Sequence, residues 1–374
     1  MKIVYFTHSV RSCWNNGNAH FLRGVLRALA ALGHEVRACE PAASWSVQNL
    51  LADHGPSGLE SFARAYPELQ PATYATLPEA TALCDGADLV IVHEWNEPTL
   101  VAELGRERRR GGRFTLLFHD THHRSVSEPE AMRGFDLSGY DGVLAFGEAV
   151  AAVYRGWGWA DRVFVWHEAA DITLFRPPET KAERSGAERS GLVWIGNFGE
   201  DERTAELETF LLAPAQAVPL TLDVYGVRYP PEGMALLARY GAAYRDWLPN
   251  ALVPDIFARH LATVHVPRRF YATLLPGIPT IRVFEALACG IPLVCAPWRD
   301  SESLFHPGQD FLVARDGTQM RHHLRALAHD AGLRESLVRN GLGAILARHT
   351  CGHRATELLA IAARLGTSAA HPVA

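Results

Sequence analysis

Short apolar segments alternate with amphipathic helical segments along almost the whole chain. This alternation is typical of parallel sheets, because each parallel connection must cross the sheet, usually as a helix, before the next strand begins. The pattern therefore predicts an α/β protein with doubly wound parallel sheets. Apolar strands are expected near residues 2–7, 35–39, 88–92, 114–118, 142–146 and 162–167 in the first half, and near 192–195, 219–225, 263–266, 292–296 and 311–314 in the second.

The chain has 374 residues, which is more than one hydrophobic core usually serves, so we expect two domains. We place one Rossmann-like domain at 1–173 and a second at 174–350, facing each other across a central cleft. Residues 176–191 are rich in Pro, Gly, Ser and charge and are expected to form an exposed connection between them. Residues 351–374 contain a final helix that is expected to cross back to the first domain.

Composition and charge exclude several classes of protein. The formal net charge of −5 at pH 7 gives no bulk attraction to nucleic acid, so we expect no nucleic-acid partner. The six cysteines lie without the spacing of metal ligands, which indicates reduced thiols. A strand begins directly after Met1, with no room for a secretory signal, and no apolar run approaches the roughly 18 residues that span a membrane. These features predict a cytoplasmic protein without a transmembrane segment, and they leave its oligomeric state open.

A loop rich in Pro and Gly leads into a short apolar helix that contains Glu285 and ends at Gly290. Backbone N–H groups at the start of this helix, near Thr280, Ile281 and Arg282, lack intrahelical acceptors and favour an anion. Glu285 lies about one turn further on, where its carboxylate can accept hydrogen bonds from a ribose attached to that anion. The segment therefore predicts a nucleotide site. The alternative is an ordinary surface ion pair between Arg282 and Glu285.

A second candidate lies after the strand expected at 192–195. Asn197 occupies a turn rich in glycine, and Arg203 follows near the start of the next helix. A guanidinium in this place can hold a diphosphate that departs during a reaction. The alternative is a solvated arginine that pairs with Glu200 or Glu206.

Two adjacent arginines, Arg268 and Arg269, follow the strand expected at 263–266. Neighbouring arginines repel each other unless an anion or acidic side chains lie between them. The pair therefore favours a phosphate-binding role over surface decoration.

In the first half, one strand ends in a cluster of His119, Asp120, His122 and His123. We expect His119 to point into the cleft, with Asp120 orienting its ring or acting as an acid or base. A histidine that merely caps a helix or forms a structural hydrogen bond is the alternative. A metal site is a further alternative, although the spacing matches no strong metal signature.

Residues expected on the acceptor side come from two other strand ends. His93 and Glu94 end the neighbouring strand and lie at the same edge of the sheet. The loop after the first strand contains Trp14, Asn15 and Asn18, which can stack on a sugar or form hydrogen bonds with it.

With these motifs the chain resembles GT-B glycosyltransferases of the family-4 type, and most closely the CgeB-like glycosyltransferase group. FEALACGIPLV is similar to the donor-binding helix of those enzymes, MKIVYF with the later GHEV to their opening strand–helix unit, and HEAADITLFRP to their domain crossing. The resemblance covers nearly the full length. It implies that the first domain binds the acceptor and the second the nucleotide-sugar donor, with no cofactor, no obligatory metal and retention of anomeric configuration.

The resemblance also implies roles for individual residues. Glu285 matches a glutamate that binds the ribose, His119 matches a histidine that contacts the transferred sugar, and Asn197 and Arg203 match a basic pair that holds the diphosphate.

Two departures from the family pattern are visible. Family-4 enzymes usually carry a second, sugar-contacting glutamate eight positions before the first, where this chain has Gly277. The first position of the basic pair is Asn197, so one positive charge is absent there. Three other arginines of the second domain can restore it, namely Arg268, Arg269 and Arg282.

These inferences predict a glycosyltransferase of the hexosyltransferase type that moves a sugar from a nucleoside diphosphate sugar to an unidentified acceptor, whether glycan, protein or small molecule. If the reaction inverts the sugar, Asp120 or His119 is the expected base. A sugar-nucleotide epimerase of the same fold and a catalytically silent sugar-nucleotide-binding protein are the main alternatives. A metal-dependent hydrolase built on the histidine cluster is a third.

Overall fold

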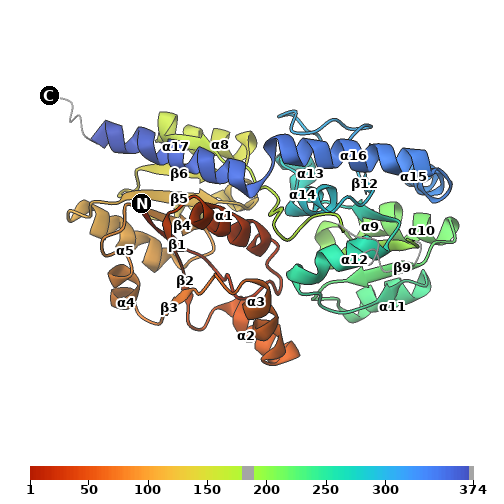
Figure 1. Cartoon of the computed structure of the whole chain (residues 1–374), viewed down its shortest axis with the longest axis horizontal. Helices are drawn as coiled ribbons and strands as arrows, with labels where there is room; N and C mark the ends of the chain where they lie inside the picture. The colour runs from red at the N-terminus through yellow and green to blue at the C-terminus, as the bar shows by residue number, and fades with distance from the viewer. Residues whose placement is uncertain (179–188, 370–374) are drawn as a thin grey trace. The chain divides into compact units, whose positions relative to one another are not determined.

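The computed structural model describes residues 1–178 and 189–369. The chain divides into two compact units, which are Met1–Glu168 with Cys351–Ala374, and Ala169–Thr350. We call them the N-terminal unit and the C-terminal unit. Each is built on one parallel sheet surrounded by helices (Figure 1).

The N-terminal unit contains seven strands among its described residues: β1 (Lys2–Phe6), β2 (Glu35–Pro41), β3 (Ala72–Tyr74), β4 (Leu89–His93), β5 (Thr115–Asp120), β6 (Gly142–Ala145) and β7 (Val163–Val165). Their order in the sheet is β3-β2-β1-β4-β5-β6-β7, and the pairing is parallel throughout. The central strands are apolar along their length, and β4 is buried at every residue, as expected where helices cover both faces of a sheet. The direction of strand addition reverses between β1 and β4, which makes this the switch point of the sheet.

The C-terminal helix belongs to the N-terminal unit. Figure 1 shows α17 beside α1, and the Trp166 indole donates a hydrogen bond of 2.9 Å to the Arg354 carbonyl within α17. The described helices of this unit are α1 (Ala19–Ala31), α2 (Trp45–His54), α3 (Ser57–Ala65), α4 (Leu77–Ala82), α5 (Pro98–Arg109), α6 (Arg124–Ser127), α7 (Pro129–Arg133), α8 (Glu148–Tyr154), the irregular turns η1 (Arg155–Trp159) and η2 (Ala160–Arg162), and α17 (Cys351–Ala369).

The C-terminal unit repeats the same plan with six described strands: β8 (Leu192–Ile195), β9 (Leu222–Tyr225), β10 (Ala243–Tyr244), β11 (Ala262–His265), β12 (Leu293–Cys295) and β13 (Leu312–Val313). Their order is β10-β9-β8-β11-β12-β13, again all parallel, so the switch point lies between β8 and β11. One apolar core, which includes Trp194, Leu211, Val264 and Leu324, packs against this sheet.

The described helices of the C-terminal unit are η3 (Glu200–Glu202), α9 (Thr204–Leu207), η4 (Glu208–Leu212), α10 (Ala213–Ala217), α11 (Pro231–Arg239), η5 (Asn250–Leu252), α12 (Val253–Arg259), α13 (Arg269–Leu274), α14 (Ile281–Ala288), α15 (Gly317–His329) and α16 (Ala331–Arg348). Of these, α14 follows the switch point and has an almost entirely buried sequence. It is the short apolar helix that the sequence predicts around Glu285.

The predicted α/β class with two doubly wound, Rossmann-like sheets is confirmed, and every predicted strand is present. The short edge strands β3 and β10 were not predicted, because three and two residues carry too little pattern to stand out. The predicted connection at 176–191 has its middle, residues 179–188, outside the described residues.

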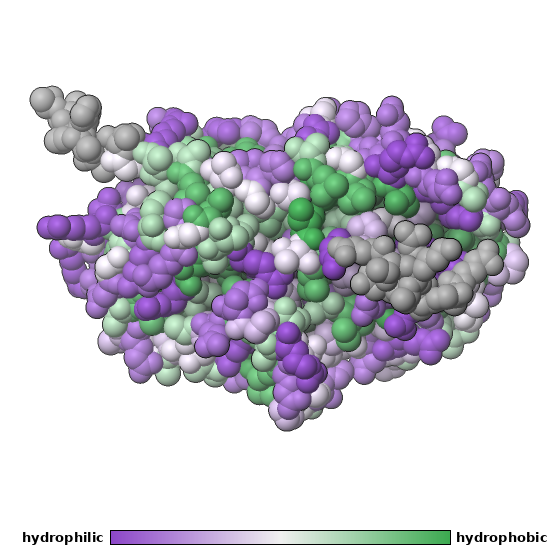
Figure 2. All heavy atoms as spheres, viewed as in Figure 1, coloured by the Kyte–Doolittle hydropathy of each residue, from purple (hydrophilic) through white to green (hydrophobic). Residues whose placement is uncertain are grey.

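Hydrophilic and hydrophobic residues are intermingled on the face of the molecule shown in Figure 2. None of the described helices is both long enough and apolar enough to cross a membrane. Since ligands of doubly wound sheets bind where strands end at the switch point, the two edges at β1/β4 and β8/β11 are the places to look for chemistry.

Candidate active site

In the C-terminal unit, the loops after β8 and β9 approach each other closely. A Cβ atom placed on Gly226 would lie 2.1 Å from the carbonyl oxygen of Gly196, so only glycine fits there. This approach brings the backbone of the two loops together beside the switch point.

Arg203 joins the two strand ends at the switch point. Its guanidinium donates to the carbonyls of Asn197 and Phe198, which follow β8, and at 3.3 Å to that of Val266, which follows β11. It also lies 5.2 Å from the centre of the Trp194 ring. Burial lowers the pKa of Arg203 to about 10, so the group stays positively charged at neutral pH.

The two adjacent arginines both have acidic partners. Arg268 lies 2.9 Å from Glu202, and Arg269 pairs with both oxygens of Glu206 at 3.0 and 3.1 Å. The pair therefore does not need a phosphate to relieve its repulsion, so that repulsion gives no argument for one, and a role of the two arginines in donor binding stays a prediction. In contrast, Arg203 has no ion-pair partner among the described side chains. Of the two acids in the predicted alternative, Glu206 pairs with Arg269, and the side chain of Glu200 lies outside the described ones.

Glu285 is fully buried in α14. Asn250 donates a hydrogen bond of 2.8 Å from Nδ2 to Glu285 Oε1, and Arg282 forms an ion pair with Oε2. The predicted contact between Arg282 and Glu285 exists, but it is a buried pair and not the surface pair of the alternative reading. The carboxylate is thereby held in one orientation.

No described side chain caps the start of α14. Thr280 holds the N-cap position, yet its hydroxyl makes no capping bond and lies 3.0 Å from His265 Nε2. The first amides of the helix, those of Ile281 and Arg282, have no intrahelical acceptor. Burial, with the charges of Arg203 and Arg282, lowers the pKa of His265 to about 3, so its ring is neutral. Helix dipole and guanidinium charge together make this place electropositive.

The neutral state of His265 predicts a pH dependence of stability. Its folded pKa of about 3 lies below the roughly 6.5 of an unfolded histidine, so as the pH falls the unfolded chain takes up a proton first. The contribution of neutral His265 to the free energy of unfolding is therefore fully present above pH 6.5, and it falls by about 1.4 kcal/mol per pH unit between pH 6.5 and pH 3. Urea titrations at pH 7 and pH 5 measure how far the free energy of unfolding drops between the two. We expect the drop to be about 2 kcal/mol smaller in His265→Gln than in the native chain. Equal losses would contradict the assignment.

Gly277 leaves no room for the second carboxylate of the family pattern. Its φ is +93°, and a Cβ atom there would lie 2.7 Å from Ser301 Oγ and 2.8 Å from Glu302 Oε1. The loop after β12 thus brings a carboxylate, that of Glu302, to the place beside Gly277. Sequence reasoning missed Glu302, because no motif spacing links it to Glu285.

At the switch point of the N-terminal unit, His93 and Asn18, both predicted on the acceptor side, lie next to each other. His93 Nε2 lies 3.0 Å from Thr121 Oγ1 and 3.2 Å from Asn18 Nδ2, and Thr121 donates to Glu94 Oε1 at 3.0 Å. Burial raises the pKa of Glu94 and lowers that of His93. The group forms one polar network at the ends of β4 and β5.

His119, which we expected to point into the cleft, has a fully buried ring. Its ring has no exposed surface and lies between Tyr5, whose hydroxyl pairs with Nδ1, and the rings of Phe21 and Trp166 at 6.0 and 4.8 Å. Burial lowers the pKa of His119 to about 3. The ring is neutral and its Nε2 has no hydrogen-bond partner among the described residues, so the predicted contact of His119 with a sugar stays a prediction.

Asp120 does not orient the ring of His119, which corrects a prediction. It is fully buried and accepts hydrogen bonds from the His122 amide at 3.1 Å and from the Tyr154 hydroxyl at 2.9 Å. Burial raises the pKa of Asp120 to about 6. Within the described part of the chain, no three His, Cys, Asp or Glu side chains are grouped to hold a metal ion.

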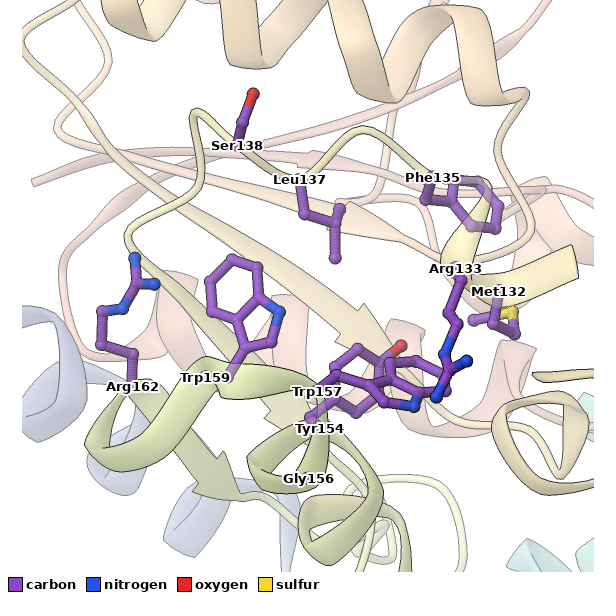
Figure 3. Close-up of a pocket in the computed structure, with 10 residues that line it drawn as sticks. All are labelled: Met132, Arg133, Phe135, Leu137, Ser138, Tyr154, Gly156, Trp157, Trp159 and Arg162. Atoms are coloured by element: carbon purple, nitrogen blue, oxygen red, sulfur yellow. The ribbon is translucent and has the colours of Figure 1, made fainter. Parts of the chain in front are cut away.

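A cavity of about 500 Å³ lies between the segments 132–138 and 154–162 of the N-terminal unit (Figure 3). Trp157 and Trp159 form opposite walls, and Leu137 lies between them. None of the residues predicted for the site lines this cavity.

Trp14 is also misplaced by the sequence prediction. It is 5% exposed, and its indole donates a hydrogen bond of 2.8 Å to Asp53, so it cannot offer a face to a sugar. Asn15 lies in the same loop with a left-handed backbone, at φ +47°. The exposed aromatic side chains at this edge are Trp45 and Trp95, which sequence reasoning missed although both follow predicted strands closely.

Comparison with known proteins agrees with this architecture. Residues 203–360 match a family model described as glycosyl transferase-like. Sucrose-phosphate synthase from Thermosynechococcus elongatus is similar with a TM-score of 0.69 and 14% identity, over 98% of this chain and 100% of that one. HepE from Anabaena, solved with UDP and glucose, has a TM-score of 0.67 and 15% identity over 97% and 100%. The catalytic domain of starch synthase IV from Arabidopsis thaliana, bound to ADP and acarbose, has a TM-score of 0.65 and 12% identity, over 98% of this chain and 99% of that one.

No curated protein sequence matches the chain. Identities this low show a shared fold, and the match to the family model covers the segment that contains Arg203, His265 and Glu285. The chain therefore has the two-domain GT-B fold of glycosyltransferases, and its residues 203–360 match a glycosyl transferase-like family.

Proposed function

We propose that the protein is a hexosyltransferase of the CgeB-like group that moves a sugar from a nucleoside diphosphate sugar to an acceptor. One observation carries the proposal: the buried, oriented carboxylate of Glu285 lies one turn inside α14, whose start is uncapped and electropositive. A ribose on Glu285 would place its diphosphate at the amides of Ile281 and Arg282. HepE with UDP and starch synthase IV with ADP, which share the fold, support a nucleotide ligand.

The transfer needs little more than charge stabilisation. The bond from the anomeric carbon to the diphosphate breaks, the acceptor oxygen bonds to that carbon, and the acceptor proton passes to a phosphate oxygen. Negative charge grows on the leaving diphosphate, where Arg203 and the dipole of α14 can stabilise it without an obligatory metal. Under this scheme the reaction retains configuration and requires no protein base, in keeping with the buried positions of His119 and Asp120.

Glu302 would supply the carboxylate that Gly277 lacks. The sugar extends from the diphosphate, which lies at the start of α14, towards the loop that precedes this helix. Glu302 comes from the loop after β12, but its Oε1 lies 2.8 Å from the place of a Cβ on Gly277 in the loop before α14, and it can accept hydrogen bonds from sugar hydroxyls. We place the reaction in the cytoplasm, where the six cysteines, none of which is in a disulfide in the described part of the chain, would stay reduced.

A thermal-shift screen of UDP, GDP, ADP and their glucose conjugates tests the proposal. A nucleotide at about 100 times its dissociation constant should stabilise the protein by roughly 2.7 kcal/mol. No shift with any of them would refute the donor site. Turnover of a stabilising sugar nucleotide in the absence of acceptor would favour an epimerase, and binding without turnover over a broad acceptor panel would favour a silent binding protein.

The role of Glu302 is tested by the same titration. Glu302→Gln should weaken binding of the sugar nucleotide several-fold and leave binding of the nucleoside diphosphate unchanged, because only the sugar lies near residue 302. Ser303→Ala, in the same loop, is the control. Equal weakening of both ligands would show that Glu302 does not contact the sugar.

A further inference from the structure

Aromatic side chains follow the carboxyl ends of four neighbouring strands in the N-terminal unit. The strands β2, β1, β4 and β5 are adjacent in that order. Trp45 follows β2, His8 follows β1, Trp95 follows β4, and His122 follows β5. We call these four side chains the aromatic row.

The rings of the row are neighbours in space as well. The ring centres of Trp45 and His8 are 6.3 Å apart, those of His8 and Trp95 6.5 Å, and those of Trp95 and His122 5.0 Å. The row therefore crosses the switch point of the sheet, between β1 and β4, where ligands of such sheets bind.

The two tryptophans are supported from within and remain open to solvent. Trp45 is 47% exposed and packs edge-on against the buried Trp14 at 5.1 Å. Trp95 is 44% exposed, and the Arg124 guanidinium lies 4.0 Å from its ring centre. A single exposed apolar side chain is common on protein surfaces. Two half-exposed indoles that are held in place and belong to one row indicate an interaction site.

Two buried polar atoms without partners belong to the same strand-end segments as the row. Thr7 Oγ1 and Asn18 Oδ1 are buried and have no hydrogen-bond partner among the described residues. Thr7 directly precedes His8, and Asn18 contacts His93, which ends β4 just before Trp95. Buried polar atoms are normally paired, so these two suit a ligand that brings hydroxyl groups with it.

We propose that the aromatic row binds the acceptor and that the acceptor is a saccharide, with sugar rings stacked on Trp45 and Trp95. The proposal rests on the proposed function, which requires an acceptor. The face of a pyranose ring carries C–H groups that pack on an indole, and the hydroxyls at its edge need polar partners. The row offers both kinds of contact, whereas a purely apolar ligand would leave Thr7 and Asn18 unsatisfied.

Fluorine NMR on protein labelled with 5-fluorotryptophan tests this site directly. The resonances of Trp45 and Trp95 are assigned with Trp45→Phe and Trp95→Phe, and the full chain is titrated with cellotetraose, maltotetraose and chitotetraose in the presence of UDP. We expect at least one tetrasaccharide to shift both resonances. Trp95→Ala should weaken its binding about three- to ten-fold, while Trp159→Ala, in the separate cavity, should leave it unchanged.

The proposal is overturned if all three tetrasaccharides leave both resonances in place, or if the resonance of Trp159, assigned with Trp159→Ala, moves instead. Unaltered melting temperature and nucleotide affinity of Trp95→Ala would show that the variant folds. The two hypotheses fail separately: a protein that binds no nucleoside diphosphate contradicts the proposed function, whereas one that binds the nucleotide but no saccharide contradicts only this inference.

Discussion

Replacing Glu285 by glutamine is expected to weaken nucleoside diphosphate binding by about ten- to a hundred-fold. The reason is the loss of charge-assisted hydrogen bonds to the ribose, worth about 1.5–3 kcal/mol each. Glutamine keeps the shape of the side chain and an oxygen that can accept from Asn250. Isothermal titration calorimetry with the nucleotide that stabilises the native chain measures the effect.

Glutamine is preferable to alanine at this position because Glu285 is also structural. Removing one member of a buried ion pair destabilises a protein by about 3–5 kcal/mol. Alanine would leave both Arg282 and Asn250 without an acceptor, whereas glutamine removes the charge but keeps one oxygen that can accept from either of them. Glu208→Gln, which alters an exposed contact with Arg239 in the same unit, is the matched control and should bind normally. Unchanged affinity in Glu285→Gln, with an intact melting curve, would remove Glu285 from the site.

Arg203→Gln should lower the turnover rate by about a hundred-fold or more while weakening nucleotide binding much less. Charge on the diphosphate grows as the glycosidic bond breaks, so a guanidinium that contacts it stabilises the transition state more than the bound donor. Steady-state kinetics that separate kcat from KM measure this. Arg203→Lys keeps the charge but cannot donate to three carbonyls at once, so it should recover only part of the rate.

Arg269→Gln is the matched control for Arg203, since its guanidinium is already paired with Glu206. We expect a change in kcat of less than about three-fold there, because an exposed ion pair contributes little. If Arg203→Gln instead weakened the binding of uridine, which has no phosphate, as much as that of UDP, the arginine would act on the fold of the loop and not on the diphosphate.

The fold could be predicted well because many separate strands and helices each carry part of the hydrophobic pattern that indicates it. Strands buried on both faces are continuous apolar runs, and the helices between them carry one apolar side, so errors of a residue or two at each end do not change the topology. The strands that escaped prediction, β3 and β10, lie at the sheet edges and contribute few residues to the core.

The C-terminal unit shows what sequence can say about a site. Glu285, Thr280 and Arg203 belong to segments where a strand ends and a helix begins. In the structure Thr280 contacts His265, whose pKa is lowered by burial and by the nearby charges of Arg203 and Arg282. Arg268 and Arg269 each form an ion pair, and Arg203 forms none with the described side chains. This difference could not be predicted, because it depends on where Glu202 and Glu206 lie in space.

In the N-terminal unit, residue identity was a poor guide to exposure. His119 and Trp14 have side chains suited to a ligand, yet both are buried, while the exposed rings at that edge belong to Trp45 and Trp95. A strand that ends at a sheet edge alternates its side chains between two faces, and the last residue can turn into the core or out of it depending on the neighbouring strands.

The sequence by itself determined the parallel α/β architecture, the places where strands end, and the helix that carries Glu285, since each follows from local periodicity and turn chemistry. Only the tertiary structure decided which charged groups neutralise one another, which rings face solvent, and that Glu302 lies beside Gly277. These outcomes depend on contacts between segments far apart in the chain, and local pattern carries no information about such contacts.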